Sequence, residues 1–466
     1  MDQLGGMVML GNPLALVCGL LFCSMMILIF ASSLKRSEFG WLIIFLEYFY
    51  VVGLGVFPLL SSLGAIDAPK LFVDYESKNG ELAAATFVHI ILYGLGALFG
   101  YFGALPFARQ VSTGITLFSV KHQIDNYAWF YSVSGLSIVF SCLYFSSVGF
   151  ETSITNASFT RSGDFSGLAG YEQYQFLKTL AMIGPFSMVF TPFIVLDGRR
   201  IKSTFLVITL FVVPVYLLTV ARVIFFDTFV FFAMLLVILG RSKFSAGVFT
   251  VVIFSFMVLV LLFGKVFVGV LSVYLFGGGD LEFPVRPESL SAYFFAHFGH
   301  LVYSIDAGIN NSFQNGPVLP EDVLLSPFGV IPSFVYSAVG LDSMSYQLVD
   351  QSQRFSCINT RYFFSEGECS VPPYFIGVSA YMLPIIGGFI FGFIRFLLYR
   401  VIENSWVRLR SHSELLWFSV FLLLIANQLM LFIPTTISFA VFISMALFFS
   451  LLIKKLFTRR KRPAIR

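Results

Sequence analysis

The stretch LALVCGLLFCSMMILIFAS, residues 14–32, contains no charged side chain and is followed closely by Lys35 and Arg36. An α-helix needs about 20 consecutive apolar residues to cross the hydrocarbon core of a bilayer. Lys and Arg beside such a run mark the cytoplasmic side of a membrane-spanning helix. The stretch therefore predicts a transmembrane helix that ends at the cytoplasm.

Ten further apolar stretches of comparable length follow it. They cover residues 41–61, 83–104, 128–150, 176–196, 204–220, 223–239, 248–270, 374–398, 415–432 and 437–453. The two stretches around Arg222 could instead form one long, interrupted segment. Hydrophobic residues make up 58% of the 466 residues and charged residues only 12%, a composition that a soluble protein could not bury. The sequence predicts an all-α, polytopic membrane protein with about eleven transmembrane helices.

Basic residues gather on one side of the predicted membrane. Alternate connections and the C-terminal tail hold most of the 29 Lys and Arg residues, namely Lys35, Arg36, Arg109, Lys121, Arg199, Arg200, Lys202, Arg241, Lys243, Arg400, Arg408, Arg410, Lys454, Lys455, Arg459, Arg460, Lys461, Arg462 and Arg466. The positive-inside rule assigns this side to the cytoplasm. The basic tail places the C-terminus inside, and eleven spans then leave the N-terminus outside. Residues 1–13 contain no Lys or Arg, which agrees with this orientation. The missing basic n-region also argues against a cleaved signal peptide.

One long connection interrupts the apolar stretches, and it divides the chain into four parts. Residues 1–270 and 374–453 form the predicted membrane bundle, residues 271–373 form a large extracytoplasmic loop, and residues 454–466 form a basic cytoplasmic tail. The loop holds ten acidic residues, but its only basic residues are Arg286, Arg354 and Arg361. Because this loop is the part of the chain with enough polar material to build a site, we expect the functional site there.

Two of the five cysteines lie in the loop. Cys357 and Cys369 have eleven residues between them, and the extracytoplasmic space is oxidising. We therefore predict a disulfide bond between Cys357 and Cys369, which would hold Arg361 on a constrained hairpin. The remaining cysteines fall inside predicted spans and are interpreted as small packing residues.

Two histidines mark a predicted helix in the loop, over residues 288–305. Apolar residues recur there at three- and four-residue spacing, and His297 and His300 project from nearly the same face. A histidine on the outer face could remove a proton from a sugar hydroxyl near neutral pH. The pair could instead bind a metal, although no third ligand is placed by spacing, or both rings could pack against neighbouring aromatic residues.

Four arginines are candidates for binding a phosphate group. Arg222 lies at the outer end of a predicted span, where a guanidinium is costly unless an anion meets it, and its planar fork binds phosphate oxygens in pairs. It could instead reach lipid headgroups or pair with Asp227. Arg161 lies earlier in the chain, in a glycine-containing outer loop. It could also be an ordinary solvated side chain. Arg354 and Arg361 could be paired with acidic neighbours in the loop or contact a phosphate.

Three further features of the sequence are glycine patterns within the spans, a charged residue inside the second span, and the lack of known nucleotide-binding and hydrolase motifs. Gly96 and Gly100, and likewise Gly388 and Gly392, form small-x-x-x-small patterns that predict close helix packing. Glu47 lies inside the second span but far from the expected outer site. The sequence contains no Walker loop, dinucleotide fingerprint, zincin motif or nucleophile elbow, so neither a nucleotide nor any other cofactor is expected.

The chain resembles the Wzy-type O-antigen polymerases, which are related to the O-antigen ligases. The resemblance rests on the arrangement of about eleven spans around a large late outer loop, and on several short motifs. These motifs are TRSGDF at residues 160–165, TVAR at 219–222, VPPYFIG at 371–377 and GGFIFG at 387–392. The repeated arginine-x₁₀-glycine pattern of some members is absent. The resemblance covers most of the chain in layout and implies a GT-C-like fold.

That resemblance implies a membrane glycosyltransferase of the bacterial inner membrane. Its partners would be an undecaprenyl-pyrophosphate-linked glycan donor, an acceptor of the same kind, membrane lipids and, as an optional partner, a polysaccharide chain-length regulator, with no nucleic acid. The acceptor hydroxyl would attack the donor's anomeric carbon with inversion and without a metal. His300 or His297 would act as base, and Arg222, Arg161, Arg354 or Arg361 would bind the pyrophosphate. A lipid-linked oligosaccharide flippase and an O-antigen ligase remain alternatives.

Overall fold

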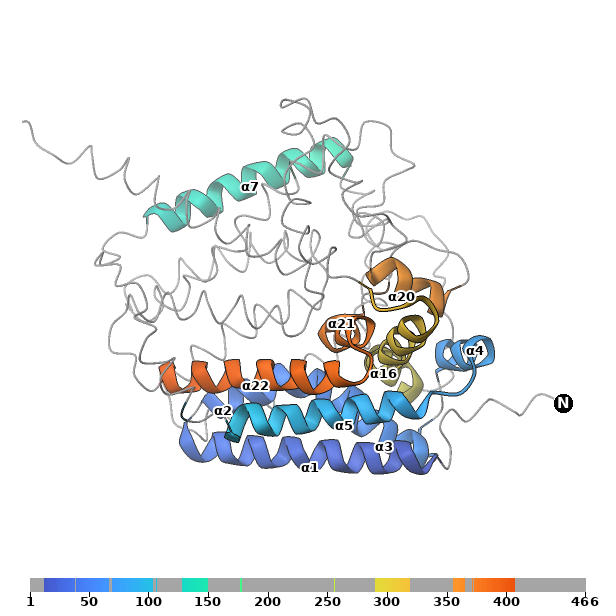
Figure 1. Cartoon of the computed structure of the whole chain (residues 1–466). Helices are drawn as coiled ribbons and strands as arrows, with labels where there is room; N and C mark the ends of the chain where they lie inside the picture. The colour runs from blue at the N-terminus through green and yellow to red at the C-terminus, as the bar shows by residue number, and fades with distance from the viewer. Residues whose placement is uncertain are drawn as a thin grey trace, which may run out of the picture.

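The computed structural model describes residues 12–37, 39–66, 69–103, 128–149, 290–318, 355–364 and 373–406, together with residues 106, 177, 255 and 371 (Figure 1). Within these ranges the secondary structure is helical and no β-strand occurs. The other predicted spans, at residues 176–270 and 415–453, lie outside the described residues, apart from residues 177 and 255. The all-α class is thus confirmed for the part of the chain that the structure describes.

The first predicted span is the α-helix α1, Pro13–Arg36. Asn12 caps its N-terminus by accepting hydrogen bonds from the backbone N–H groups of Leu14 (2.9 Å) and Ala15 (3.2 Å). Such a cap satisfies donors that the first turn leaves free, and Pro13 at the first helical position costs no hydrogen bond. Lys35 and Arg36 occupy the last turn of the helix, whereas the sequence analysis placed them in the connection that follows it.

Of the described helices, three are long and apolar enough to cross a membrane. They are α1, the continuous segment Phe39–Ser62, which comprises α2 (Phe39–Tyr50), the π-helix η1 (Val51–Val56) and α3 (Phe57–Ser62), and the segment Ala84–Gly103, which comprises α5 (Ala84–Leu98) and the π-helix η2 (Phe99–Gly103). Their bounds agree within two residues with the predicted stretches 14–32, 41–61 and 83–104, apart from the extra turn at the end of α1. α7, Ala128–Val148, coincides with a fourth.

The predicted glycine patterns form the contact between α5 and α22, Ile386–Trp406. A Cβ atom on Gly96 would overlap the carbonyl oxygen of Phe389, and one on Gly392 would overlap that of Tyr93. Gly100 and Gly388 face the partner helix in the same way. The absence of side chains therefore lets two helices far apart in the sequence lie backbone to backbone, as small residues do in membrane proteins.

The prediction of one span over residues 374–398 was wrong. Two helices occupy the region, α21 (Tyr374–Met382) and α22, and the helix breaks at Leu383, which has φ −143° and ψ 83°. Pro384 causes the break, because the residue before a proline avoids the α conformation. The ring nitrogens of His89 contact the carbonyl oxygen of Pro384 (2.8 Å) and Oγ of Ser379 (2.9 Å), which fastens the break to α5.

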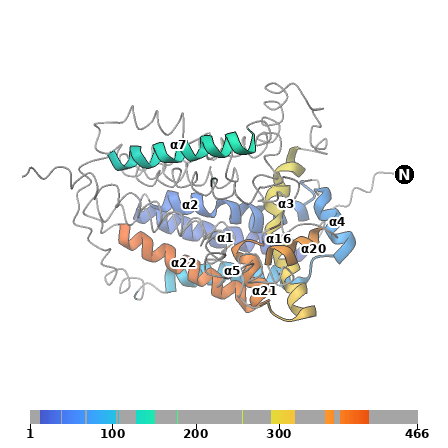
Figure 2. The ribbon, with the colours of Figure 1, turned by 90° about the horizontal axis from the view of Figure 1, so that it is seen from above.

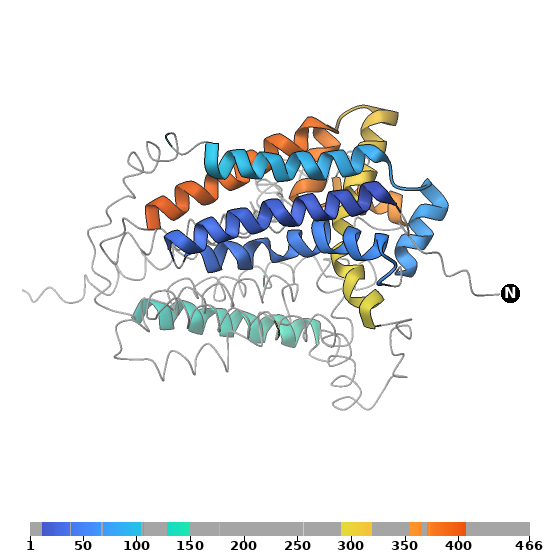
Figure 3. The same ribbon diagram turned by 90° about the horizontal axis from the view of Figure 1, so that it is seen from below.

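α16, Leu290–Asn315, crosses the end of the bundle instead of continuing along it (Figures 2 and 3). It is ten residues longer at its C-terminus than predicted, and it ends at Gly316, whose φ of +87° suits glycine. Two short helices join it there, α4 (Lys70–Asn79) and α20 (Phe355–Phe363). We call this the α16 end, and the opposite end, where α1, η2 and α22 finish, the Glu403 end.

Candidate functional site

A buried carboxylate joins the helices at the α16 end. Asp306 on α16 is 1% exposed and accepts four hydrogen bonds. Oδ1 accepts from the backbone N–H of Ala83 (2.9 Å) and Oγ1 of Thr86 (2.7 Å), while Oδ2 accepts from the hydroxyl of Tyr75 (3.0 Å) and Nδ2 of Asn310 (2.9 Å). Burial raises the pKa of Asp306, and the four donors oppose that rise. Asp306 thus acts as a structural clamp whose oxygens are already used.

A second carboxyl group lies beside it with more freedom. Glu76 on α4 is half-buried, and its Oε1 accepts a hydrogen bond from the hydroxyl of Tyr303 on α16 (2.9 Å). Burial raises the pKa of Glu76 to about 6, against the effect of the Tyr303 hydrogen bond, while Glu81 and Asp306 add to the rise. A carboxyl group with this pKa can exchange a proton near neutral pH.

Aromatic rings form the wall between α4, α16 and α20, and His300 belongs to that wall. Phe72 stacks on Tyr303 with ring centroids 4.3 Å apart and planes 8° apart. The imidazole of His300 lies edge-on to Phe72 (5.6 Å) and 5.1 Å from Phe363. Of the roles considered for His300, this position favours packing among aromatic residues. His297 lies on α16, but its side chain is outside the described residues.

The C-terminal turn of α20 carries one of the predicted phosphate ligands. Arg361 is exposed in that turn, and whether a Cys357–Cys369 bond constrains it stays a prediction. Nζ of Lys78 donates to the Arg361 carbonyl oxygen (2.6 Å), and Nδ2 of Asn79 donates to that of Tyr362 (3.0 Å). These donors from α4 satisfy carbonyl groups that a helix end leaves free, and they place the Lys78 ammonium group beside the backbone of Arg361.

The remaining predicted site residues are mostly not described. Arg161, Arg222, Arg354 and Cys369 lie outside the described residues. Cys357 on α20 is disulfide-bonded, whereas Cys18, Cys23 and Cys142 are free, with Cys142 exposed and not packed. The pairing of Cys357 with Cys369 stays a prediction.

An ion pair that the sequence analysis missed lies inside the bundle. Nη2 and Nε of Arg395 on α22 contact Oε1 of Glu47 on α2 at 2.6 and 2.7 Å, and the Tyr399 hydroxyl donates to the same oxygen (2.5 Å). The guanidinium lies 3.9 Å from the ring centroid of Tyr50, a cation–π contact. Arg395 and Glu47 are fully buried. Their opposite charges in two otherwise apolar segments were the available signal for this pair.

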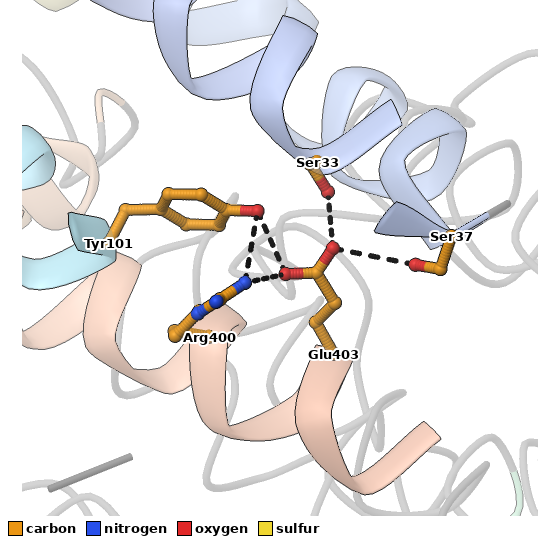
Figure 4. Close-up of polar contacts among 5 residues, drawn as sticks. All are labelled: Ser33, Ser37, Tyr101, Arg400 and Glu403. Atoms are coloured by element: carbon orange, nitrogen blue, oxygen red, sulfur yellow. Dashed lines mark hydrogen bonds and ion pairs between the residues drawn. The ribbon is translucent and has the colours of Figure 1, made fainter. Parts of the chain in front are cut away.

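A third buried carboxylate, Glu403, joins three helices at the Glu403 end (Figure 4). Its Oε1 accepts from Ser33 (2.9 Å) and Ser37 (3.4 Å), and its Oε2 accepts from the Tyr101 hydroxyl (2.8 Å) and Nη1 of Arg400 (2.6 Å). Arg400 is only 1% exposed, so its assignment to a connecting loop was wrong. α22 continues through Arg400 because Glu403, one turn later, compensates its charge.

The described residues hold no group of three or more His, Cys, Asp or Glu side chains that could bind a metal ion. The candidate site is the α16 end, where Glu76 is a half-buried carboxyl group and Lys78 and Arg361 are exposed cations. Such a surface can bind a hydroxylated ligand through the carboxylate and an anionic group through the cations. The search for similar proteins finds no matching family model, curated protein or solved structure.

Proposed function

We propose that the chain is a bacterial inner-membrane protein with about eleven spans and its N-terminus outside. Lys35 and Arg36 in the last turn of α1 support this orientation, because Lys and Arg favour the cytoplasmic side. The Glu403 end is then cytoplasmic and the α16 end extracytoplasmic. All polar material of the candidate site lies, in this proposal, on the outer face.

We further propose that it is a glycosyltransferase that polymerises undecaprenyl-pyrophosphate-linked oligosaccharide repeat units. The observation that carries the proposal is the joining of a half-exposed carboxyl group with two exposed cations at one end of an apolar bundle. The apolar helices suit two polyprenyl chains, and the polar end suits the two headgroups. The sequence resemblance to the O-antigen polymerases points to the same reaction.

The reaction would proceed at the α16 end by direct displacement. The acceptor's terminal hydroxyl forms a bond to the anomeric carbon of the donor's first sugar, and the bond from that carbon to the pyrophosphate breaks. Attack opposite the leaving group inverts the configuration. Arg361 and Lys78 supply positive charge where negative charge develops on the departing pyrophosphate, which is how electrostatic catalysis lowers such a barrier.

The test is polymerisation by the purified protein in proteoliposomes that contain a synthetic lipid-pyrophosphate repeat unit. We expect a ladder of products without added nucleotide, and a loss of 10-fold or more in Arg361→Ala/Lys78→Ala, since each transition-state contact contributes a few kcal/mol. The matched control is Lys35→Ala, which removes an exposed cation at the opposite end. A ladder unchanged in the double variant would contradict this site. A single transfer to a different acceptor, with no ladder, would favour a ligase.

The Glu47–Arg395 pair favours a flippase as the second candidate function. Ionisable groups inside a membrane often mark a transport pathway. Translocation of a fluorescent lipid-linked oligosaccharide by wild-type liposomes, lost in Glu47→Gln, without any glycosidic product, would support that candidate over the polymerase.

A further inference from the structure

Glu76 has one oxygen held in place and one oxygen available. Its Oε1 accepts from Tyr303 (2.9 Å), and Tyr303 is itself fully buried and stacked on Phe72. The hydroxyl that orients Glu76 is therefore fixed. Within the described part of the chain, Oε2 of Glu76 forms no hydrogen bond or ion pair, and the half-buried side chain leaves it open to a ligand.

The contrast with Asp306 identifies Glu76 as the reactive carboxyl group of this end. Both oxygens of Asp306 accept two hydrogen bonds each, which leaves no free lone pair in a favourable direction. The other groups that influence Glu76 are Tyr303 and Asp306 on α16 and Glu81 after α4. No described cation pairs with Glu76, so its carboxylate remains available as a base.

We propose that Glu76 is the catalytic base, binding the acceptor sugar's attacking hydroxyl and accepting its proton. The inference rests on the proposed polymerase function. As the hydroxyl oxygen bonds to the anomeric carbon, its proton passes to a Glu76 carboxylate oxygen, and the electron pair of the breaking bond leaves with the lipid pyrophosphate. The proton then passes from Glu76 to water.

The environment of Glu76 suits this role better than that of His300. Its pKa of about 6 leaves the group ionised at pH 7 yet basic enough to accept a proton, which is the favourable range for a general base. Because a hydrogen bond from Tyr303 stabilises the ionised form, loss of that bond should raise the pKa of Glu76 further. His300, the base expected from the sequence, lies instead among aromatic rings.

The experiment measures polymerisation and acceptor binding in proteoliposomes from pH 4.5 to 8. Glu76→Gln should lower kcat by about 10²–10⁴-fold with a change in KM below about threefold, as expected for loss of a general base. Tyr303→Phe should move the acidic limb of the pH profile to higher pH. Asp74→Asn, an exposed carboxyl group on the same helix, is the matched control, and His300→Gln should retain activity.

The outcomes separate the inference from the function it rests on. If the wild-type protein forms no ladder, the proposed function fails. If it forms a ladder and Glu76→Gln keeps wild-type kcat, or His300→Gln alone abolishes activity, the function stands and the assignment of Glu76 is overturned. If Glu76→Gln does not accumulate in the membrane, Tyr303→Phe decides, because an unmoved acidic limb then refutes the proposal.

Discussion

Removing one partner of the Glu47–Arg395 ion pair should lower the free energy of unfolding far more than replacing both partners. Both side chains are fully buried, and the three contacts to Glu47 Oε1 are 2.5–2.7 Å long. Removal of one partner from a buried ion pair costs about 3–5 kcal/mol, because the other charge stays buried and uncompensated. We therefore expect Glu47→Leu to lower the free energy of unfolding by about that amount.

The double variant Glu47→Leu/Arg395→Met removes both charges and keeps apolar volume between α2 and α22. What remains is the Tyr399 hydroxyl without its acceptor, and an unsatisfied buried donor costs about 1–3 kcal/mol. The double variant should thus be more stable than Glu47→Leu alone. If the loss in the double variant is smaller than the sum of the losses in Glu47→Leu and Arg395→Met, the two charges are coupled.

Reversible unfolding in mixed detergent micelles, followed by far-UV circular dichroism, measures these differences. Ile394→Val, at an exposed position of α22, is the control and should change the free energy of unfolding by less than about 0.5 kcal/mol. The reasoning is refuted if Glu47→Leu loses less than about 1 kcal/mol, or if the double variant is less stable than both single variants.

Three further predictions concern other contacts. Gly392→Ala should destabilise the protein by about 1–3 kcal/mol because its Cβ would overlap the Tyr93 carbonyl group. The control Gly135→Ala, where nothing lies within 4 Å of the added Cβ, should be neutral or stabilising. Equal effects of the two substitutions on thermal unfolding would contradict the close contact at Gly392. Asp306→Ala should lower the free energy of unfolding by at least about 3 kcal/mol, because it leaves four hydrogen-bond donors unsatisfied. Limited proteolysis of this variant should then cleave the chain near α4. An unchanged digestion pattern would contradict the role of Asp306 as a clamp. The fold raises the pKa of Glu76, so the contribution of this group to stability is present below its ordinary pKa of 4.5 and is lost as the pH rises through about 6. The melting temperature should therefore fall less between these pH values in Glu76→Gln than in the wild-type protein. An equal fall in both proteins would refute the pKa shift.

Hydropathy predicted where helices cross but not where they break. The bounds of the segment Ala84–Gly103 were predicted to within one residue, because the length of an apolar run is enough to locate such a helix. Pro384 lies in an equally apolar run, and averaging over a window concealed the break between α21 and α22. Its conformational effect on Leu383 was readable from the sequence. The small-residue patterns on α5 and α22 were read correctly, because only packing explains glycines at that spacing.

The candidate site was less accessible to sequence reasoning. Asp306 meets Thr86 across 220 residues of chain, and no spacing rule connects such positions. The same holds for Glu76 and Tyr303, 227 residues apart. A histidine in a polar loop attracted attention because its ordinary pKa lies near neutrality, whereas burial shifted the pKa of Glu76 toward the same range only once the fold had formed.

The contact between α5 and α22 also constrains the order in which the protein can be assembled. Gly388 on α22 lies against the backbone of His89 on α5, 299 residues earlier in the chain, and at a synthesis rate of about 5–20 residues per second α22 follows α5 by roughly 15–60 s. During that interval the glycine face of α5 has no α22 to cover it, and lipid or a temporary partner must do so. Newly made chains therefore spend most of their synthesis with the bundle open, and a ribosome stalled before residue 386 would leave an inserted protein that cannot close.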